Sequence, residues 1–371
     1  MSKLLVLETP TQESIKVRAI TYQNYATPFA LKTLYIPIAN KESIVTPTEV
    51  LVKVMTTSVN PVDCILKNFS NNYFGPKFKI PGGDFAGIVV KAGSESGYKE
   101  GDKIYGDCLS LNKRGSFSDS IIFEPKKAFV CEKIPDGMPF EEAGSLACVS
   151  NTAFESLRKY NGNLYGKNVL VLGAGTSVGF FAVQFAKYYF NAKNVVATCS
   201  SQSSFKTTKA GADLTIDYTK SEVSKLEALL EFVKIHGFFD IIVDCVRDES
   251  VISNFPNLLQ KGKDGGIFTQ ITGSYTLDYK NIHLYNMIPS WRYLYNKWKY
   301  QLGFSDYPIV ATWTERDEEY GAAIEKLWKE NKLDIVIDSS YNAYKDFNEA
   351  FEKVATCTAK GKVILNWNNP E

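Results

Sequence analysis

One segment near the middle of the chain restricts the fold more than any other. Residues 168–172 form a short apolar run, which is typical of a strand buried on both faces of a parallel sheet. A turn of small residues, 173–179, follows, and after it come a predicted helix over 180–190 and a second strand over 194–198. A strand, a glycine-rich turn, a helix and a parallel strand within about thirty residues predict the first half of a dinucleotide-binding sheet.

The alternation of strands and helices continues after this segment. Apolar strands are predicted over 213–217, 239–244 and 266–271, with a helix over 221–236 between the first two. Such alternation predicts a doubly wound parallel sheet. Later in the chain the sequence predicts helices over 317–332 and 344–356 and a strand over 362–365.

The first 150 residues are instead rich in predicted β-structure. Residues 50–55 alternate between apolar and polar side chains, and residues 87–92 form another strand-like run. Glycine and proline are dense around both runs, which favours strands joined by turns. A length of 371 residues suits two domains, each with a core of its own.

Composition excludes several classes of protein. The chain carries 42 Lys and Arg against 41 Asp and Glu, so it lacks the cationic field of a protein whose main task is to bind nucleic acid. Its 23 Phe, 21 Tyr and 5 Trp exclude a disordered chain. The sequence contains no long uncharged apolar run, so no transmembrane segment is expected.

Cysteine and histidine usage bears on metals and on compartment. Seven cysteines lie scattered without a CxxC pair, which disfavours a disulfide framework or a zinc cluster. Reduced thiols indicate a reducing compartment, and neither end of the sequence resembles a targeting signal, so we expect a cytoplasmic protein. His236 and His283 are the sole histidines, too few for a histidine-based metal site.

The turn from Gly173 to Gly179 has the properties of a phosphate-binding loop. The helix that follows it offers free backbone N–H groups and a partial positive charge. Gly175 allows a diphosphate to approach the backbone closely, and Gly179 allows the helix to pack against the sheet. The alternative is a tight turn with a purely structural role, because a glycine pattern alone is a weak sign.

The end of the second strand bears on which dinucleotide is bound. NAD-binding sites usually have an acidic residue there, which holds the ribose hydroxyls. This chain instead has Thr198-Cys-Ser-Ser201, followed by Lys206, and these hydroxyls and this ammonium suit a 2′-phosphate. We therefore expect NADP(H) rather than NAD(H), the alternative being an ordinary polar loop.

A series of short motifs extends over nearly the whole chain. In their joint order they resemble the medium-chain dehydrogenase/reductases, specifically the zinc-free quinone and enone oxidoreductase branch. The motifs are Asn60-Pro-Val-Asp63, Pro81-Gly-Gly-Asp-Phe-Ala-Gly87, Gly101-Asp-Lys-Ile-Tyr-Gly106, Gly115-Ser-Phe-Ser-Asp119, Glu142-Ala-Gly144 with Thr152-Ala153, Gly211-Ala-Asp213 with Ile216-Asp-Tyr218, and Gly361-Lys-Val-Ile364.

The resemblance implies an α/β protein with two domains. A GroES-like β-barrel domain would cover 1–149 and be completed by 316–371, and a Rossmann domain with the doubly wound parallel sheet would cover 150–315. The active site would lie in the cleft between them. Members of this family often form homodimers, so a homodimer is a further expectation. The zinc-dependent members have a Gly-His-Glu motif and a cysteine quartet that this chain lacks, so we expect no metal site.

The glycine turn and the resemblance together predict a set of cofactor contacts. By resemblance, two of its members lie near the nicotinamide ribose, four surround the adenosine phosphate and three flank the nicotinamide. In chain order the set is Asn60, Thr152, Gly173, Ala174, Gly175, Thr176, Ser177, Val178, Gly179, Ser200, Ser201, Lys206, Tyr218, Val246, Gly273 and Ser274.

The chain also departs from the family pattern. Thr176-Ser177 replaces a glycine pair in the phosphate turn, and Arg247 stands where a glycine is common. Ile65 stands where some relatives have Tyr or Lys, and Lys67 follows two positions later. Hydride passes directly from the cofactor in this family, and the proton can come from water or a ribose hydroxyl. Asn60 of the Asn-Pro-Val-Asp motif and Lys67 remain as the candidate catalytic residues.

Residues 275–315 diverge most from short family members. Helical spacing places Trp291, Tyr295 and Trp298 on one face of a segment, 285–300, that also carries basic residues. We expect this face to pack in the core or to form a lid over an apolar substrate, with peripheral membrane contact through 285–300 as the alternative. The long insert is also similar to that of a fungal side branch of the family, linked to membrane-protein trafficking and stress.

Two functions follow as expectations. The first is an NADPH-dependent, zinc-independent oxidoreductase that reduces a quinone or an α,β-unsaturated carbonyl, a small apolar substrate. The second is a scaffold with the same fold and little or no turnover, acting in membrane-protein trafficking or stress response.

Overall fold

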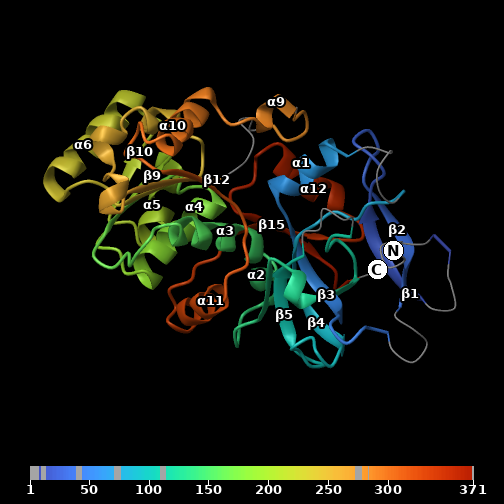
Figure 1. Ribbon diagram of the computed structural model, residues 1–371. Coiled ribbons are helices and arrows are strands. Elements are labelled where there is room, and N and C mark those ends of the chain that lie inside the picture. The colour runs from blue at the N-terminus through green and yellow to red at the C-terminus, as the bar shows by residue number, and fades with distance from the viewer. Residues whose placement is uncertain are drawn as a thin grey trace. The chain divides into compact units, whose positions relative to one another are not determined.

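The chain forms two compact units (Figure 1). The structure, a computed structural model, describes residues 8–9, 14–38, 44–70, 77–108, 114–271, 278–282 and 284–369. Unit 1 comprises Met1–Cys148, Thr276–Asn286 and Ile335–Glu371, and unit 2 comprises Val149–Tyr275 and Met287–Asp334. Residues 316–334, which the sequence assigned to the first domain, thus belong to unit 2.

Unit 2 contains a parallel sheet of six strands in the order β10-β9-β8-β11-β12-β13. Numbered along the chain, this order is 3-2-1-4-5-6, the Rossmann arrangement, and it confirms the predicted doubly wound sheet. The strands are β8 (Asn168–Leu172), β9 (Asn194–Cys199), β10 (Leu214–Asp217), β11 (Ile241–Asp244), β12 (Ile267–Ile271) and β13 (Ile309–Thr312).

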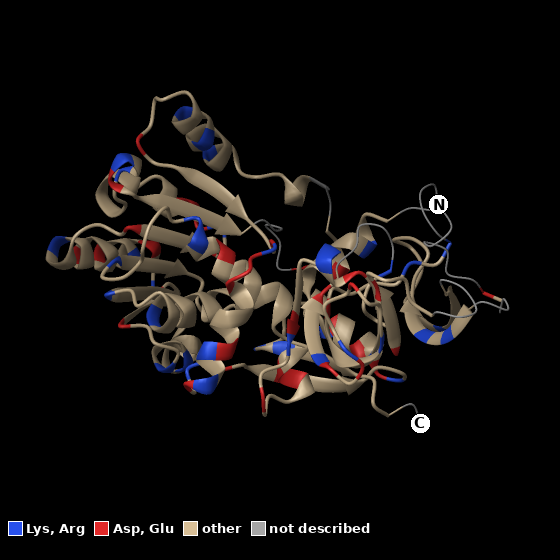
Figure 2. Cartoon of the chain, turned by 60° about the horizontal axis from the view of Figure 1, so that its bottom comes forward, with Lys and Arg blue, Asp and Glu red and all other residues tan. Residues whose placement is uncertain are grey.

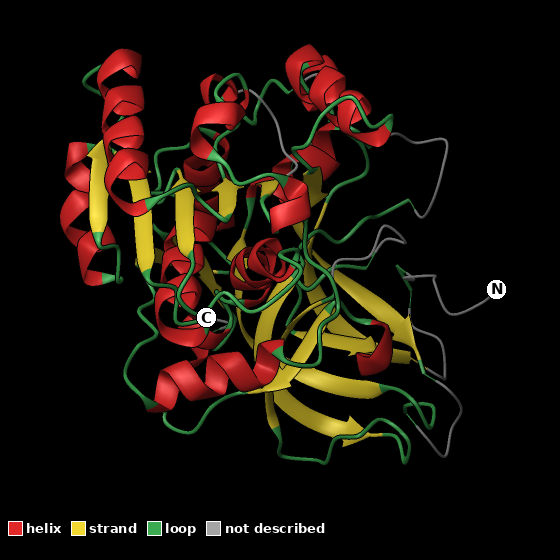
Figure 3. Ribbon diagram, turned by 60° about the vertical axis from the view of Figure 1, so that its left-hand side comes forward, coloured by secondary structure: helices red, strands yellow, loops and turns green. Residues whose placement is uncertain are grey.

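Helices lie beside the strands of this sheet (Figure 3). Leu170, Leu172 and Val196 of the central strands pack with Phe232 and Phe268 in one fully buried apolar cluster. Val169, Val171 and Val195, which alternate with these residues, are buried too, and so the central strands are apolar on both faces. The helices are α3 (Ala147–Arg158), α4 (Ser177–Gln184) with the π-helical turn η3 (Phe185–Tyr189), α5 (Ser201–Lys209), α6 (Glu222–His236), α7 (Glu249–Ile252), α8 (Phe255–Leu258), η4 (Gly262–Asp264), α10 (Trp291–Gln301) and α11 (Tyr320–Lys329).

Unit 1 is built around a sheet of seven strands in the order β14-β15-β3-β4-β5-β7, with β6 paired to β3 and a separate β1-β2 pair. The late strand β15 lies between β14 and β3, so the end of the chain completes the sheet that the first half begins. The strands are β1 (Ser14–Thr21), β2 (Ala30–Pro37), β3 (Val50–Val59), β4 (Asp84–Ala92), β5 (Lys103–Asp107), β6 (Ser120–Phe123), β7 (Val130–Lys133), β14 (Ile337–Asn342) and β15 (Lys362–Asn366).

Helix α12 (Phe347–Ala355) packs against the core of unit 1. Phe351 of α12 stacks on Phe29 with ring centroids 3.8 Å apart and contacts Phe117 edge-on at 5.6 Å. The other helices with residues in this unit are α1 (Pro61–Asn68), η2 (Pro125–Lys127), α2 (Phe140–Ala143) and α9 (Leu284–Met287). Among the described residues, none of the helices has the length and apolar composition needed to cross a bilayer.

Candidate functional site

The glycine turn after β8 requires glycine at two positions. Gly173 has a φ of +78°, and a Cβ there would lie 2.2 Å from a methyl carbon of Val246. A Cβ on Gly179 would lie 2.4 Å from the carbonyl oxygen of Gly173. The turn follows β8 at the point where the strand order changes direction, which is where nucleotides bind in open α/β sheets. The glycines of the predicted phosphate turn are therefore required by packing, and the turn lies where nucleotides bind in sheets of this topology.

Thr176 caps the helix that follows the turn. Its side-chain oxygen accepts from the backbone N–H of Gly179 at 3.1 Å and donates to the carbonyl of Gly173 at 2.8 Å. Beneath the turn, the backbone N–H of Gly173 donates to the Thr198 hydroxyl at 3.0 Å. The threonine that replaces a family glycine therefore has a structural role, because it stabilises the start of α4.

Residues predicted to hold a 2′-phosphate gather around the start of α5. The ammonium of Lys206 lies 3.4 Å from the carbonyl oxygen of Gly175, and burial lowers its pKa. Ser200 is the N-cap residue of α5, and Tyr218 is half exposed. Lys206 therefore contacts the phosphate turn itself, from the neighbouring βα unit.

Asp217 is a residue of this region that the sequence did not single out. Parallel pairing of β10 with β9 places it beside Cys199, and its carboxylate accepts from the hydroxyl of Ser201. Hydrogen bonds from Ser201 and Thr219 lower the pKa of Asp217 to about 2. An anion therefore lies next to a hydroxyl that was expected to face the 2′-phosphate. The sequence signal for it is an acidic residue at the end of the third strand of the sheet rather than of the second.

The loop after β11 lies against the glycine turn. Val246 is half exposed and covers Gly173, as the short Cβ distance above shows. The buried carboxylate of Asp244 accepts from the backbone N–H groups of Val246 and Asp248, each at 3.0 Å. Arg247 has a φ of 58°, the left-handed conformation that glycine adopts most easily. Of the remaining predicted contacts, Thr152 is buried against Thr314, and Gly273 and Ser274 lie outside the described residues.

Asn60, predicted near the nicotinamide, belongs to a buried polar network in unit 1. Its side-chain oxygen accepts from the ammonium of Lys362 at 2.6 Å, and its side-chain nitrogen donates to Asp84 at 2.8 Å. Lys362 also lies 3.1 Å from Asp84. The hydroxyl of Ser58 donates to the same carboxylate at 2.6 Å. Both side-chain heteroatoms of Asn60 are therefore engaged within unit 1.

Asp63 extends this network and fixes the start of α1. It accepts from the backbone N–H of Asn60 at 2.8 Å. Burial, aided by the nearby charges of Asp84 and Asp107, raises the pKa of Asp63 to about 8. The three carboxyl groups are buried with one ammonium, Lys362, and a raised pKa keeps one of them protonated at neutral pH.

Lys67, the second catalytic candidate, lies in the last turn of α1. Its ammonium donates to the carbonyl oxygen of Tyr25 at 2.9 Å and lies 5.3 Å from the centre of the Phe29 ring. Burial lowers its pKa. Ile65, by contrast, is buried in unit 1.

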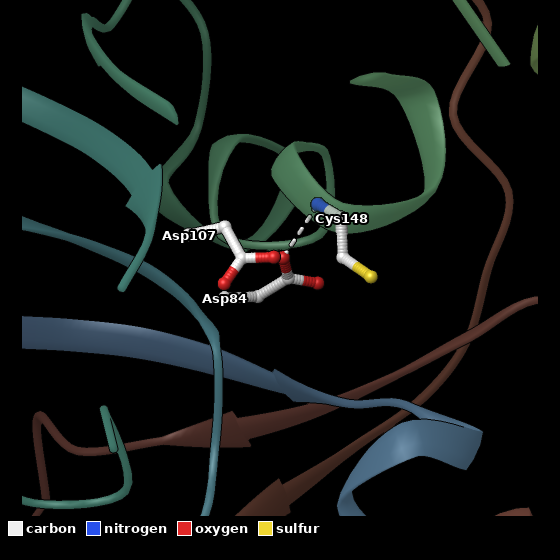
Figure 4. A group of neighbouring side chains, drawn as sticks. All are labelled: Asp84, Asp107 and Cys148. Atoms are coloured by element: carbon white, nitrogen blue, oxygen red, sulfur yellow. Dashed lines mark hydrogen bonds between the residues drawn. The ribbon is translucent and has the colours of Figure 1, made fainter. Parts of the chain in front are cut away.

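One cluster has the residue types of a metal site. Ligand atoms of Asp84, Asp107 and Cys148 lie within 4.8 Å of one another (Figure 4). Asp84 already accepts from the Cys148 backbone N–H at 2.7 Å and from the Lys362 ammonium, and burial raises the pKa of the Cys148 thiol well above its usual value. Zinc prefers thiolate and imidazole ligands. Two carboxylates and one thiol, with the ammonium of Lys362 already bound to Asp84, do not match the thiolate and imidazole ligands of zinc sites.

Comparison with known proteins identifies the family. The profile of the alcohol dehydrogenase GroES-like domain matches residues 46–136, and the profile named zinc-binding dehydrogenase matches residues 210–365. The chain belongs to the medium-chain dehydrogenase/reductase family. The predicted combination of a GroES-like and a Rossmann domain is thereby confirmed.

Individual members of the family are similar over nearly their full length. Protein YIM1-2 of Lachancea thermotolerans is 28% identical over 366 residues, covering 95% of this chain and 98% of that protein. Protein YIM1 of Candida glabrata is 29% identical over 340 residues, covering 86% and 91%. The similarity to these fungal proteins confirms the predicted side branch of the family.

Solved structures share the fold. A quinone oxidoreductase from Coxiella burnetii has a TM-score of 0.71 at 20% identity, covering 95% of this chain and 99% of its own. An alcohol dehydrogenase from Thermotoga maritima has a TM-score of 0.70 at 20% identity, with the same coverage. The human synaptic vesicle membrane protein VAT-1 homolog-like protein has a TM-score of 0.66 at 18% identity, covering 96% and 99%. At these identities the similarity shows a common fold.

Proposed function

We propose that the chain is an NADPH-dependent, zinc-independent oxidoreductase that reduces a quinone or an α,β-unsaturated carbonyl. One observation carries the cofactor half of the proposal, namely the turn that begins at Gly173. The turn follows β8 at the switch point of the sheet and leads into the capped helix α4, whose first backbone N–H groups suit a phosphate. The substrate half rests on the family resemblance, in which a bound nicotinamide cofactor supplies a hydride.

The choice of NADPH rests on the balance of charges around α5. Lys206 offers a cation beside the phosphate turn, and Ser200 and Ser201 offer hydroxyls. Asp217 opposes them with one negative charge, held next to Ser201. We assign the 2′-phosphate to the Lys206 side of this group, because Lys206 is the cation that contacts the phosphate turn.

A thermal-shift measurement with NADPH and with NADH tests the cofactor. A ligand that binds only the folded chain raises the midpoint of unfolding, by about 2.7 kcal/mol of stability at a hundredfold excess over Kd. We expect a larger shift with NADPH than with NADH. Absence of a shift with either dinucleotide would refute the cofactor proposal.

The matched variants Lys206→Glu and Lys209→Glu locate the phosphate contact. Both lysines lie on α5, but Lys209 is exposed and contacts Asp334 at 3.7 Å rather than the turn. We expect K206E to weaken NADPH binding about tenfold or more and to affect NADH much less, whereas K209E leaves both nearly unchanged. An equal loss of NADPH and NADH in K206E would remove this assignment.

A second candidate, a scaffold with little turnover, is favoured by a specific observation. The side chains of Asn60 and Lys67 are both engaged in hydrogen bonds within unit 1, with Lys362 and Asp84 in one case and with Tyr25 in the other. An Asn amide does not act as an acid, and the hydrogen bond to Tyr25 holds the Lys67 ammonium within unit 1. NADPH oxidation with a panel of quinones and enones separates the candidates, since binding without turnover on any of them would support the scaffold.

A further inference from the structure

Helix α10 exposes an aromatic stripe that the sequence led us to expect in the core or in a lid. Its side chains are largely accessible, with 77% of Trp291, 41% of Tyr295 and 54% of Trp298 exposed. Leu302, directly after the helix, continues the stripe and is 50% exposed. We call these four residues the aromatic face of α10. Burial in the core was therefore a wrong expectation for them.

A single aromatic residue anchors the helix to unit 2. Tyr293, on the opposite side of α10, is buried in the apolar cluster beneath the sheet. The hydroxyl of Ser290 caps the helix by accepting from the backbone N–H of Tyr293 at 3.0 Å. Trp291 and Tyr295 contact each other with ring centroids 5.9 Å apart. The buried Tyr293 thus fixes the position of α10 on unit 2, and the aromatic face lies on the solvent-exposed side of the helix.

The segment that carries this face has only positive charge. Between Asp278 and Asp306 the sequence contains no acidic residue, and α10 carries Arg292, Lys297 and Lys299. In Figure 2 the helix shows Lys and Arg positions and no acidic ones. Within the described part of the chain, no carboxylate lies within ion-pair distance of these three cations.

The cations lie over the aromatic rings rather than over acidic groups. The ammonium of Lys299 is 5.5 Å from the centre of the Tyr295 ring, and that of Lys297 is 5.9 Å from the centre of the Tyr293 ring. The pair of Lys299 with the exposed Tyr295 ring leaves the ammonium free to contact an anion while the ring presents an apolar surface, whereas the ring beside Lys297 is that of the buried Tyr293. The partner of this surface should therefore be both anionic and apolar.

A second copy of the chain does not have that chemistry. In a two-fold contact the same patch lies on both sides, so one cationic patch would be brought against another. Like charges across an interface cost free energy. A single-stranded nucleic acid would pair with the cations and stack on the rings, but its binding does not require exposed aliphatic side chains. Ile288, Leu294 and Leu302 are exposed alongside the rings, and they favour acyl chains.

We propose that α10 docks on an anionic lipid bilayer and lies in the plane of its interface. Trp291 and Trp298 would sit at the depth of the headgroups, where aromatic side chains concentrate in membrane proteins. Lys297 and Lys299 would contact anionic headgroups, each of which adds to the attraction. This inference stands apart from the proposed reductase activity, because no residue of the aromatic face belongs to the nucleotide turn.

Flotation of the full-length protein with vesicles tests the proposal. The vesicles are phosphatidylcholine alone or phosphatidylcholine with phosphatidylserine. The variants are Trp291→Ala/Trp298→Ala and Lys297→Glu/Lys299→Glu. Matched controls are Tyr165→Ala, an aromatic side chain that is 73% exposed elsewhere in unit 2, and Lys326→Glu/Lys329→Glu, which makes the same change of charge on α11.

We expect the wild type to float with phosphatidylserine vesicles and less with phosphatidylcholine alone, and added salt to weaken the binding. Each α10 variant should lower the partition coefficient about tenfold or more, while both controls behave like the wild type. Circular dichroism establishes that the variants are folded. Should a variant not fold, the lipid and salt dependence of the wild type still decides the outcome.

Four results would overturn the proposal. The first is that the folded wild type does not float with phosphatidylserine vesicles, and the second is that it floats but the α10 variants do not reduce the flotation. The third is a dimer that W291A/W298A converts to monomer without any lipid binding. The fourth is retention of single-stranded DNA without lipid binding. The last two would assign the aromatic face to a second copy or to nucleic acid.

Discussion

At the scale of single residues, the buried network of unit 1 shows how polar side chains are accommodated in a core. Asp63, Asp84 and Asp107 are each at most 1% exposed, and Lys362 is 5% exposed. Hydrogen bonds from Ser58, Asn60 and Lys362 compensate the burial of Asp84. Among the residues that the structure describes, no cation contacts Asp63, and its burial therefore favours the protonated form.

The stability of the protein should therefore depend on pH through Asp63. Its pKa is about 8 in the folded chain and close to 3.9 when unfolded, so the native state holds one more proton between those values. The free energy of unfolding then falls as pH rises through this range, by at most about 1.4 kcal/mol per pH unit. Asp63→Asn keeps an acceptor for Asn60 and removes the titration, so urea unfolding should show a shallower decline. The slope that remains is expected from the other carboxyl groups whose pKa burial raises, namely Glu155, to about 7, and Asp119 and Asp244.

Asp217→Asn is the control for this measurement. Hydrogen bonds lower the pKa of Asp217 to about 2, so its contribution is lost only as pH falls below about 4. The D217N variant should therefore have the wild-type slope between pH 5 and 8, an interval of about three units. A D63N variant with an unchanged slope would show that Asp63 does not titrate in this way.

At the scale of elements, the sequence located most strands and helices, and the ends of several differ for identifiable reasons. Strand β3 was expected to end at Met55 but continues to Val59, because Thr56, Thr57 and Ser58 are buried despite their hydroxyls. The helix expected over 180–190 starts at Ser177, where Thr176 caps it, and ends in a π-helical turn. Periodicity reports where apolar residues recur, whereas caps and buried hydroxyls depend on partners that are distant in sequence.

Alanine at Gly173 should disrupt the phosphate turn, and alanine at Gly166 provides the matched comparison. Both glycines have a left-handed φ, +78° and +75°, so both changes strain the backbone by about 1–2 kcal/mol. Only at Gly173 would the new Cβ meet another side chain, that of Val246, whereas nothing lies within 4 Å at Gly166. We expect G173A to lose about 1–3 kcal/mol more free energy of unfolding than G166A, and to lose the NADPH-induced shift.

The double variant Gly173→Ala/Val246→Ala isolates the cause. Removing the Val246 methyl groups should restore part of the stability that G173A loses, while the cost of the left-handed backbone remains. Equal stabilities for G173A and G166A would mean that the contact with Val246 is relieved by a small shift of the loop.

At the scale of the whole molecule, unit 1 is discontinuous in sequence and depends on the end of the chain. Strand β15 pairs with β3 from Val363 to Asn366, and Phe351 of α12 packs on Phe29 and Phe117. The last residue of unit 2 is Asp334, whose backbone N–H and carbonyl group both form hydrogen bonds with the side chain of Gln184. Each unit has an apolar cluster of its own.

A chain that ends at Asp334 should therefore lose unit 1 and keep unit 2. Without β15 and α12, the amides of β3, β4 and β5 should exchange with solvent rapidly, because their sheet and core are incomplete. The amides of β8, β9 and β11 should keep their protection in hydrogen-exchange mass spectrometry. Protection of β3 equal to that in the full-length chain would contradict the dependence of unit 1 on the chain end.

The sequence by itself determined the family, the parallel sheet and the phosphate turn, because these depend on local order. An apolar strand, a glycine turn and a helix follow one another within a few residues. Few residues other than glycine adopt a φ of +78°, and few polar residues are tolerated in a strand that is buried on both faces. The same holds for the motif order that led to the GroES-like and Rossmann domains.

Only the tertiary structure decided which distant side chains meet. It brought Lys362 to Asn60 and Asp84 across a separation of 302 and 278 residues, placed Asp217 beside Ser201, and left the aromatic face of α10 exposed. The physical reason is the same in each case. Local pattern sets the face on which a side chain lies, whereas its partner, its charge state and its burial depend on which strand or helix packs against that face.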